Sequence, residues 1–278
     1  IDALYGVFQV LLKERAKRGA IDFESAETIM QFDDLGKIEK IVPSVRNDAH
    51  RLIEECMLAA NVCASDFLAQ HKHPTLYRVH EGPTPEKLEN LRALLREFAL
   101  TLPGGEEPQA KDYAQLLDKV KDRPEAPLLQ TAMLRSLQQA VYSPDNVGHF
   151  GLAYEGYAHF TSPIRRYPDL LVHRAIKAVL RGEKYKPGLK WPALGEHCSM
   201  TERRADDATR DVQNWLKCYY MRDKIGDVFD GSVSAVTSFG MFVLLDDAYV
   251  EGLVHITELG QDYFHYDAAL HSLTGERG

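Results

Sequence analysis

Two adjacent arginines lie on a short, stiff stretch of the chain, which reads HFTSPIRRYPDLLVHRAI at residues 159–176. Ser162 and the proline after it form a helix-start signal, and Pro168 repeats that signal. Because proline fixes its own φ and restricts the residue before it, Arg165 and Arg166 are predicted on a rigid turn at the positive end of a helix. Backbone N–H groups at a helix start and a guanidinium fork are well suited to bind a phosphate. The stretch therefore predicts a site for a phosphate-bearing ligand.

Positive charge continues past this turn. Residues 159–190 contain eight Lys or Arg and two acidic residues, although the whole chain has a net charge of −8. On the predicted helix, Arg174, Lys177 and Arg181 lie opposite the apolar face. Such a basic stripe can follow a nucleic-acid backbone, but a solvated helix surface has the same pattern. The stripe alone leaves both interpretations open.

The overall composition bounds the class of protein. The 278 residues are 45% hydrophobic and 27% charged, which is typical of a soluble globular chain with one large domain or two. No apolar run approaches the roughly 20 residues of a membrane helix, and no signal peptide opens the chain, so we expect no membrane contact. The four cysteines form no CxxC pair, and Cys56 and Cys63 share one helical face. We therefore expect core thiols in a reducing cytoplasm.

Residues 1–222 are predicted to be mainly helical. The clearest helix is residues 48–70, which follow an Asn/Asp start signal and repeat apolar residues with a helical period. Two extended segments, residues 20–44 and 73–85, interrupt the helices. Other helices are expected at residues 2–18 and 85–102, with two more between residues 111 and 142.

The character of the sequence changes at Gly226. The stretch GDVFDGSVSAVTSFGMFVLLDDAYVEGLVHITEL has short β-rich runs separated by glycines, the pattern of a small antiparallel barrel of the OB type. We place a domain boundary between Arg222 and Gly226. Residues 226–278 have room for three strands and a loop, whereas about five strands close such a barrel. We therefore expect an α+β chain with a partial barrel, taken from a longer protein.

Four stretches together resemble the RNB catalytic domain of the ribonuclease II/R family of processive 3′-to-5′ exoribonucleases, and more closely its ribonuclease R branch. They are RGAIDFES, NDAHRLIEECMLAAN, GHFGLAYEGYAHFTSPIRRYPDLLVHRAI and EHCSMTERRADDATRDVQNWLKC, in family order within residues 1–222. Residues 226–278 resemble the S1-type RNA-binding module that follows this domain. The resemblance implies a parent enzyme that hydrolyses single-stranded RNA from its 3′ end to nucleoside 5′-monophosphates with a divalent metal.

The resemblance assigns a catalytic role to Arg165, the first arginine of SPIRRY, which is expected to face the channel and reach the phosphate under attack. The assignment agrees with the physics, because a held guanidinium stabilises charge that builds on the non-bridging oxygens. Arg166 is implied either as a second substrate contact or as a structural ion-pair residue.

The resemblance also implies residues that hold the last nucleotide. Phe23 corresponds to an aromatic clamp on the base, although an ordinary core residue would have the same pattern. A glutamate of the IEE pair contacts ribose hydroxyls, and the 2′-OH distinguishes RNA from DNA. We expect this glutamate to be Glu55, because it lies on the flank of the apolar face, whereas Glu54 points toward water.

The barrel is expected to hold single-stranded RNA further along the strand. In modules of this kind, aromatic residues on the strand face stack on bases with little sequence preference. The corresponding residues here are Phe239, Phe242 and His255.

The sequence departs from the family in its metal site. The family holds a divalent metal, usually Mg²⁺, with aspartates of an RDFDDA-like motif, and this motif is missing here. Asp33 and Asp34 have the wrong context and are read as hairpin-turn residues. Three further aspartates, Asp206, Asp207 and Asp211, alternate with arginines, which favours surface ion pairs. We therefore expect Mg²⁺ ligands upstream, none within the chain, and no activity from the chain alone.

Two alternatives stay open beside the exoribonuclease. One is a noncatalytic RNA-binding or regulatory protein with an OB-fold module, and the other is a degenerate RNB protein that has lost its nuclease chemistry. The expected partner is RNA in each case, through a single-stranded 3′ end for the enzyme. The sequence predicts no oligomeric state.

Overall fold

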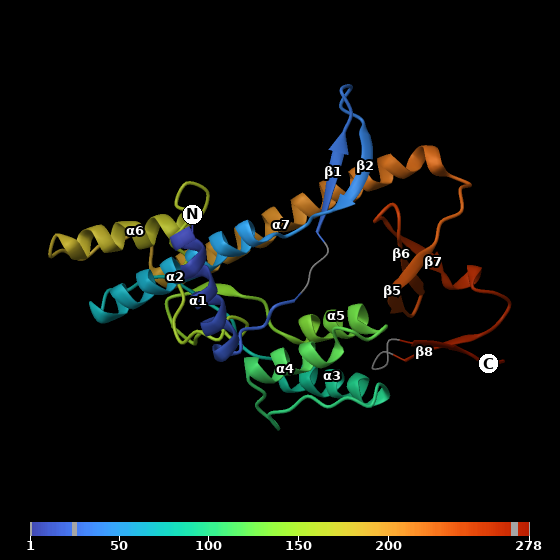
Figure 1. Ribbon diagram of the computed structural model, residues 1–278, viewed down its shortest axis with the longest axis horizontal. Coiled ribbons are helices and arrows are strands. Elements are labelled where there is room, and N and C mark those ends of the chain that lie inside the picture. Colours follow the sequence, from blue (N-terminus) through green and yellow to red (C-terminus); the bar gives the residue numbers. More distant parts are fainter. Residues whose placement is uncertain (1, 24–26, 268–271, 278) are drawn as a thin grey trace.

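A computed structural model describes residues 2–23, 27–267 and 272–277. Figure 1 shows a helical part with α6 (Tyr167–Leu180) at one end of the view and a group of strands at the other, connected by the long helix α7 (Trp191–Met221). None of the helices in these ranges is both long and apolar enough to cross a membrane. The other helices are α1 (Asp2–Arg18), α2 (Asp48–Gln70), α3 (Pro85–Glu97), α4 (Ala110–Val120) and α5 (Ala126–Ser136), with short 3₁₀ turns η1 (Arg222–Lys224) and η2 (Ile256–Glu258).

The helices form where the apolar periodicity predicts them, with one early end. Asn47 caps α2, since its side chain accepts a hydrogen bond from the backbone N–H of His50 and the His50 side chain accepts one in return. The helix α3 ends at Glu97 instead of residue 102, because Ala99 takes a left-handed φ of 53°.

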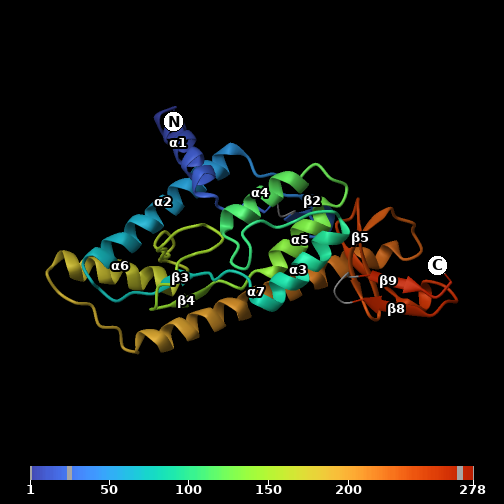
Figure 2. The same ribbon diagram turned by 90° about the horizontal axis from the view of Figure 1, so that it is seen from below.

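The helices α3, α4 and α5 pack around one apolar cluster. Its fully buried members include Leu95, Tyr113, Leu129 and Met133. The Tyr113 hydroxyl lies 2.9 Å from the Ser136 hydroxyl, so the ring is buried without leaving its polar atom unpaired. Figure 2 shows these three helices together, next to strand β5 of the barrel.

Two further clusters hold the other helices. Leu68 of α2 meets Val172 and Ala175 of α6, which explains why these helices lie side by side in Figure 1. The start of α7 packs on a strand pair, β3 (Tyr77–Val79) and β4 (Val141–Ser143). A Cβ at Gly195 would lie 2.6 Å from the Tyr142 carbonyl oxygen, so glycine permits this close packing. Of the two cysteines expected in the core, Cys56 is half-buried and Cys63 is exposed, so the expectation was wrong for Cys63.

Strands β1 (Thr28–Phe32) and β2 (Ile38–Pro43) form an antiparallel hairpin. Asp33 lies in its turn and accepts hydrogen bonds from the backbone N–H groups of Leu35, at 2.9 Å, and Lys37, at 2.8 Å. The predicted hairpin role of the FDD stretch is confirmed.

The barrel region has more strands than the sequence predicts. Strands β5 (Gly231–Thr237), β6 (Gly240–Leu245) and β7 (Glu251–His255) form one antiparallel sheet in that order. A second pair follows, β8 (Phe264–Asp267) with β9 (Ser272–Gly275). A loop was expected here, because these strands are short and their residues FHYD and SLTG lack an apolar run.

The barrel is held by the end of α7 and the β1–β2 hairpin. Ile41 of β2 is 1% exposed and lies in one cluster with Ala248 and Val250 of the β6–β7 connection. The Lys217 ammonium of α7 donates to the Tyr249 carbonyl oxygen at 2.9 Å. A cavity of about 350 Å³ separates β5 from α3 and α5.

Candidate functional site

The two arginines lie on a turn that a buried carboxylate fixes. Asp169, in the first turn of α6, is 0% exposed, and its Oδ1 accepts hydrogen bonds from the Ser162 backbone N–H and from Arg166 Nη2, each at 2.8 Å. The backbone N–H of Arg166 also donates to the Ser162 carbonyl oxygen at 3.0 Å. A carboxylate near a helix N-terminus is also stabilised by the helix dipole. Asp169 therefore fixes the turn at both Ser162 and Arg166.

The same arrangement separates the roles of the two arginines. Arg166 is half-buried and paired with Asp169, which is the structural ion-pair alternative of the sequence analysis. Arg165 is exposed, and its guanidinium makes no hydrogen bond or ion pair with the described residues. The turn therefore presents one engaged and one available guanidinium. The predicted position of Arg165 in the substrate channel stays a prediction.

An apolar cavity lies beside the paired arginine. It has a volume of about 500 Å³, and its polar lining comes from Glu54 and Asn61 of α2, His50, Tyr157 and Arg166. The buried Asn61 connects α2 to the arginine loop, residues 158–166. Its side-chain amide donates to the Tyr157 hydroxyl at 2.8 Å, and its Oδ1 accepts hydrogen bonds from the backbone N–H groups of Phe160 and Thr161 in that loop. A cavity of this size with few convergent polar groups is typical of a ligand site.

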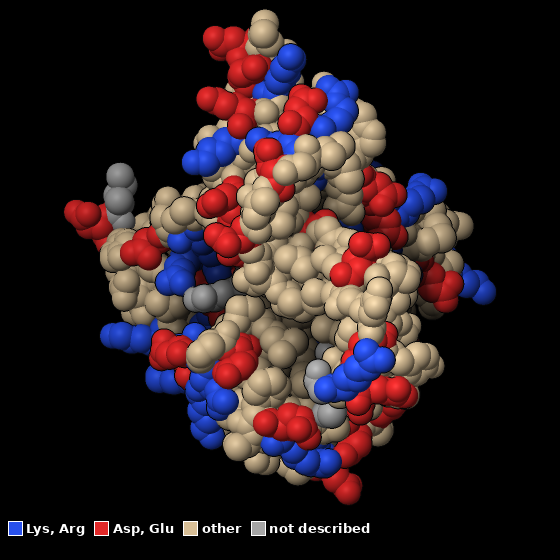
Figure 3. Space-filling model, turned by 90° about the vertical axis from the view of Figure 1, so that its right-hand side faces the viewer, with Lys and Arg blue, Asp and Glu red and all other residues tan. Residues whose placement is uncertain are grey.

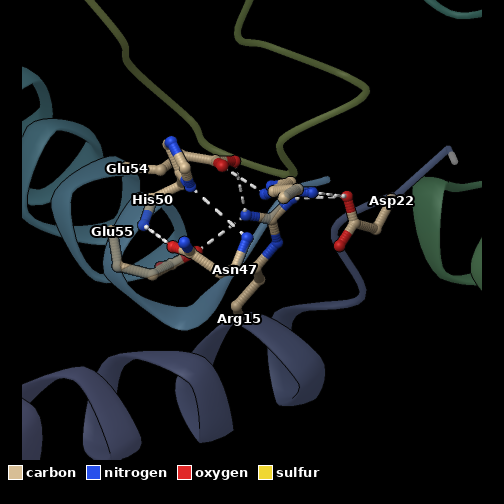
Figure 4. Close-up of polar contacts among 7 residues, drawn as sticks. Arg15, Asp22, Asn47, His50, Glu54 and Glu55 are labelled. Carbon is tan, nitrogen blue, oxygen red and sulfur yellow. Dashed lines mark hydrogen bonds and ion pairs between the residues drawn. The ribbon is translucent and has the colours of Figure 1, made fainter. Parts of the chain in front are cut away.

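The glutamate pair of α2 is arranged differently from the prediction. Glu55 is 4% exposed, and its Oε1 lies 2.7 Å from Nη1 of Arg15 in α1 (Figure 4). Glu54 is partly exposed and lines the cavity. Glu55 lies on the flank of α2 as expected, but α1 packs along that flank and buries the carboxylate, a neighbour that the periodicity of one helix does not indicate. Contact between Glu55 and ribose stays a prediction.

Phe23 combines both interpretations given above. Its ring is half-buried and packs against the apolar cluster of α3, α4 and α5. The core contact explains its position, while its role as a base clamp stays a prediction.

A second polar cluster was missed in the sequence, although GHFGLAYEGYAHF already contains closely spaced histidines and aromatics. His149 and His159 are half-buried on either side of Tyr157, and His159 Nδ1 lies 2.9 Å from the Tyr142 hydroxyl. Burial lowers the pKa of His149 to about 3, helped by the nearby charges of His80 and Arg78. Burial, followed by the charge of Arg166, lowers the pKa of His159 to about 2. Both imidazoles are therefore neutral near pH 7.

Arg78 and Glu202 complete this cluster. The Arg78 guanidinium lies over the Tyr142 ring at 4.7 Å and pairs with Glu202 of α7 at 2.5 Å. Burial and the Glu202 charge raise the pKa of Tyr142, so its hydroxyl stays protonated. The cluster links β3, β4, α7 and the start of the arginine loop.

The predicted stacking residues of the barrel lie close together. Phe239 and Phe242 have ring centroids 6.2 Å apart in an edge-on arrangement, and Phe239 is 47% exposed. Gly240 pairs with His255 and Phe242 with Leu253, so Phe242 and His255 fall on one face of the sheet, while Phe239 lies in the turn before β6. Figure 3, which looks at the barrel end, shows a broad uncharged area bordered by charges of both signs. Contact with bases stays a prediction for all three residues.

The described residues offer no fit for the family's metal. Residues 2–23, 27–267 and 272–277 contain no group of three or more His, Cys, Asp or Glu side chains that could hold an ion. Asp207 lies 3.7 Å from Arg210, as expected for a surface ion pair.

Comparison with known families decides the assignment. The RNB domain family matches residues 1–182, and the S1 RNA binding domain family matches residues 222–276. The chain belongs to the RNB domain family. Ribonuclease R of Escherichia coli K12 is 50% identical over 288 residues, covering 99% of this chain and 35% of that protein. Ribonuclease R of Vibrio cholerae is 50% identical over 289 residues, with the same coverage.

The arrangement of this chain also has a solved counterpart. The structure of Mycoplasma genitalium RNase R in complex with ribose methylated single-stranded RNA matches with a TM-score of 0.92 and 29% identity, over 99% of this chain and 44% of that one. The chain thus spans about a third of the length of the curated relatives and less than half of this structure.

Proposed function

We propose that the full-length protein containing this chain is a 3′-to-5′ exoribonuclease of the cytoplasm. It hydrolyses single-stranded RNA processively to nucleoside 5′-monophosphates with a divalent metal, usually Mg²⁺. The observation that carries the proposal is the pair of arginines on the fixed turn, where Arg166 is held by Asp169 and Arg165 is left available for an anion. The family match and the similarity to an RNase R solved with single-stranded RNA support the same function.

In this proposal Arg165 stabilises the phosphate during hydrolysis. Negative charge builds on the non-bridging oxygens of the phosphodiester, and a guanidinium offers two parallel N–H donors to such oxygens. A donor held in place before the reaction needs no reorganisation when the charge develops, which is the largest electrostatic benefit of an enzyme site. The buried Asp169 pair supplies this rigidity through the backbone of the turn.

Substrate binding is assigned to two separate surfaces. Glu54, at the cavity, and Glu55, behind it, are the candidates for contact with the terminal ribose. Phe23 directly follows Asp22, which pairs with Arg15, the arginine that contacts both glutamates. Phe239, Phe242 and His255 would stack on bases further along the strand, which needs only flat π-faces. The barrel then retains the strand while its 3′ end is shortened.

A direct assay compares this chain with the full-length protein on a 5′-labelled poly(A) oligonucleotide with Mg²⁺. We expect the full-length protein to shorten the RNA from its 3′ end, and the chain alone to bind RNA without degrading it. Degradation by the chain alone would show that metal ligands exist within it. Lack of turnover by the full-length protein would overturn the proposed activity.

A noncatalytic RNA-binding protein is the second candidate. It is favoured by one observation, the close pair of aromatic rings, Phe239 and Phe242, on the barrel. It predicts RNA affinity that falls steeply with salt in the full-length protein, and no turnover that depends on Arg165.

A further inference from the structure

Five charged side chains form a closed network between α1, α2 and the segment that carries Phe23 (Figure 4). Arg15 contacts Glu54 at 3.1 Å and Asp22 at 3.3 Å, and Arg46 pairs with the same two carboxylates, with Asp22 at 3.4 Å. Arg15, Glu54, Arg46 and Asp22 therefore make a ring of alternating charge. Glu55 is bound to Arg15 on the buried side of that ring, at 2.7 Å.

The members of the ring differ in exposure, and this gives it an inner and an outer side. The side chains of Arg15 and Glu55 are 9% and 5% exposed, whereas those of Arg46 and Asp22 are 39% and 49% exposed. The inner pair is locked, because either charge alone would be left in a largely water-free position. Glu54, whose side chain is 37% exposed, lines the cavity beside Arg166 and is accessible to a ligand.

The ring also joins the segment that carries Phe23, the candidate base contact, to the helix α2, which carries the candidate ribose contacts. Asp22 immediately precedes Phe23, and Arg46 immediately precedes Asn47, the cap of α2. Glu54 and Glu55 lie two turns further along α2. Movement of any one segment would break at least one ion pair, so the ring fixes the Phe23 segment relative to the glutamate pair.

Arginine is required at the centre of this arrangement. Arg15 holds three carboxylates with one planar fork of N–H donors, whereas a lysine is a single point charge. Burial acts to lower the pKa of Arg15, but Glu55, Asp22 and Glu54 outweigh it, so the pKa is raised and the guanidinium stays charged.

We propose that Arg15 and Arg46 are positioning residues, which hold the α2 glutamates and the Phe23 segment in one geometry so that the base and the ribose of an RNA 3′ end are recognised together. The inference rests on the proposed exoribonuclease function. It predicts that loosening the ring lowers the discrimination between ribose and deoxyribose at the 3′ end more than it lowers turnover of RNA.

The test uses the full-length enzyme and two oligonucleotides that differ only in a 2′-deoxy residue at the 3′-terminal nucleotide. The outer variants Arg46→Gln and Asp22→Asn change exposed side chains, so the fold should persist. The ratio of kcat/KM for the two substrates should fall about 3- to 10-fold, the range for one hydrogen bond lost at a site, with an unchanged Tm. Arg15→Ala should lower both the ratio and the Tm, and Arg15→Lys should recover the Tm but not the ratio.

Arg96→Gln is the matched control, because Arg96 is an exposed arginine that pairs with Glu89 on α3, away from the ring. An unchanged ratio in folded Arg46→Gln and Asp22→Asn enzymes would overturn the inference, as would an equal fall in Arg96→Gln. An inactive wild-type enzyme would instead contradict the proposed function, so the two failures are distinguishable.

Discussion

The buried carboxylate of Asp169 lies 2.8 Å from the guanidinium of Arg166, while the guanidinium of the adjacent Arg165 is exposed. Two neighbouring residues of one type therefore have separate roles in stability and in function. Substitutions at these two positions should distinguish the roles.

Replacement of Arg166 or Asp169 with alanine should destabilise the chain. Removal of either side chain leaves the charge of the other without a partner in a buried environment, since Asp169 is 0% exposed. Breaking such a buried pair typically costs about 3–5 kcal/mol of unfolding free energy. Arg165→Ala should change that free energy by less than about 0.5 kcal/mol, as is usual for an exposed side chain. Urea unfolding of the three variants measures the difference, and equal losses at the two arginines would contradict the assignment.

Activity should show the opposite order. In the full-length enzyme, Arg165→Ala should lower kcat by about 10²- to 10³-fold, the effect of removing one preorganised donor. Arg165→Lys should recover only part of this loss, because an ammonium lacks the bidentate fork. Single-turnover assays on poly(A) at saturating RNA check this, with Arg96→Ala on α3 as a control for loss of an exposed arginine.

Phe239 should contribute to RNA affinity without contributing to stability. The ring is 47% exposed, and loss of one stacked base typically costs about 1–3 kcal/mol of binding free energy. Phe239→Ala should therefore weaken binding of labelled poly(A) at least about fivefold, as measured by fluorescence anisotropy. Phe32→Ala is the control, since that ring is 53% exposed on the β1–β2 hairpin. Equal weakening by both changes would argue against a site on the barrel face.

The half-buried histidines should make the fold sensitive to acid. Their pKa values in the folded chain, about 3 for His149 and about 2 for His159, lie below the value of about 6.5 expected when unfolded. The unfolded state thus binds more protons as pH falls, so the stabilisation is complete above about pH 6.5 and is lost toward pH 3. Each histidine should contribute a slope of up to about 1.4 kcal/mol per pH unit.

Urea unfolding between pH 7.5 and 4.5 measures this slope. His149→Gln should make it shallower, because a neutral amide replaces the titrating ring. His197→Gln, at an exposed position on α7, should leave it unchanged. A pH-independent stability in the unmodified chain would show that these histidines are already charged or hydrated in the fold.

Ile41 should anchor the barrel. Ile41→Ala removes a side chain that is 1% exposed between the hairpin and the β6–β7 connection, and such truncations typically cost about 2–5 kcal/mol. The barrel should then be cleaved faster by protease near η1 and unfold at a lower urea concentration than the helical part. Ile29→Ala, on the same hairpin but 52% exposed, should have neither effect.

The sequence was sufficient for features that depend on local pattern. Helices such as α2 follow from apolar periodicity and a capping residue, and the turn at Asp33 follows from its own side-chain hydrogen bonds. The rigid arginine turn was also predictable, because proline restricts the backbone on both sides of it. Strands β8 and β9 were missed, since each has only four residues and neither contains an apolar run.

The features of the site that the sequence did not predict depend on contacts between elements distant in sequence. Glu55 is buried because Arg15 lies across from it, 40 residues earlier, and nothing in α2 indicates that partner. The same holds for His149 and His159, whose environment comes from separate segments that carry Arg78, Tyr142 and Glu202. Packing between elements therefore decides which carboxylates and imidazoles are accessible.

The continuity of α7 has a mechanical consequence. The helix has 31 residues, roughly 46 Å at 1.5 Å per residue, and after Gly195 it contains no proline or glycine at which it could bend. The first turns of α7 pack against the Tyr142 backbone, and near the other end of the helix Lys217 is hydrogen-bonded to the barrel. A pulling force on RNA bound to the barrel would therefore be transmitted along α7 to the cluster of His149, His159 and Tyr142. No proline or glycine after Gly195 would let the helix bend and absorb that force.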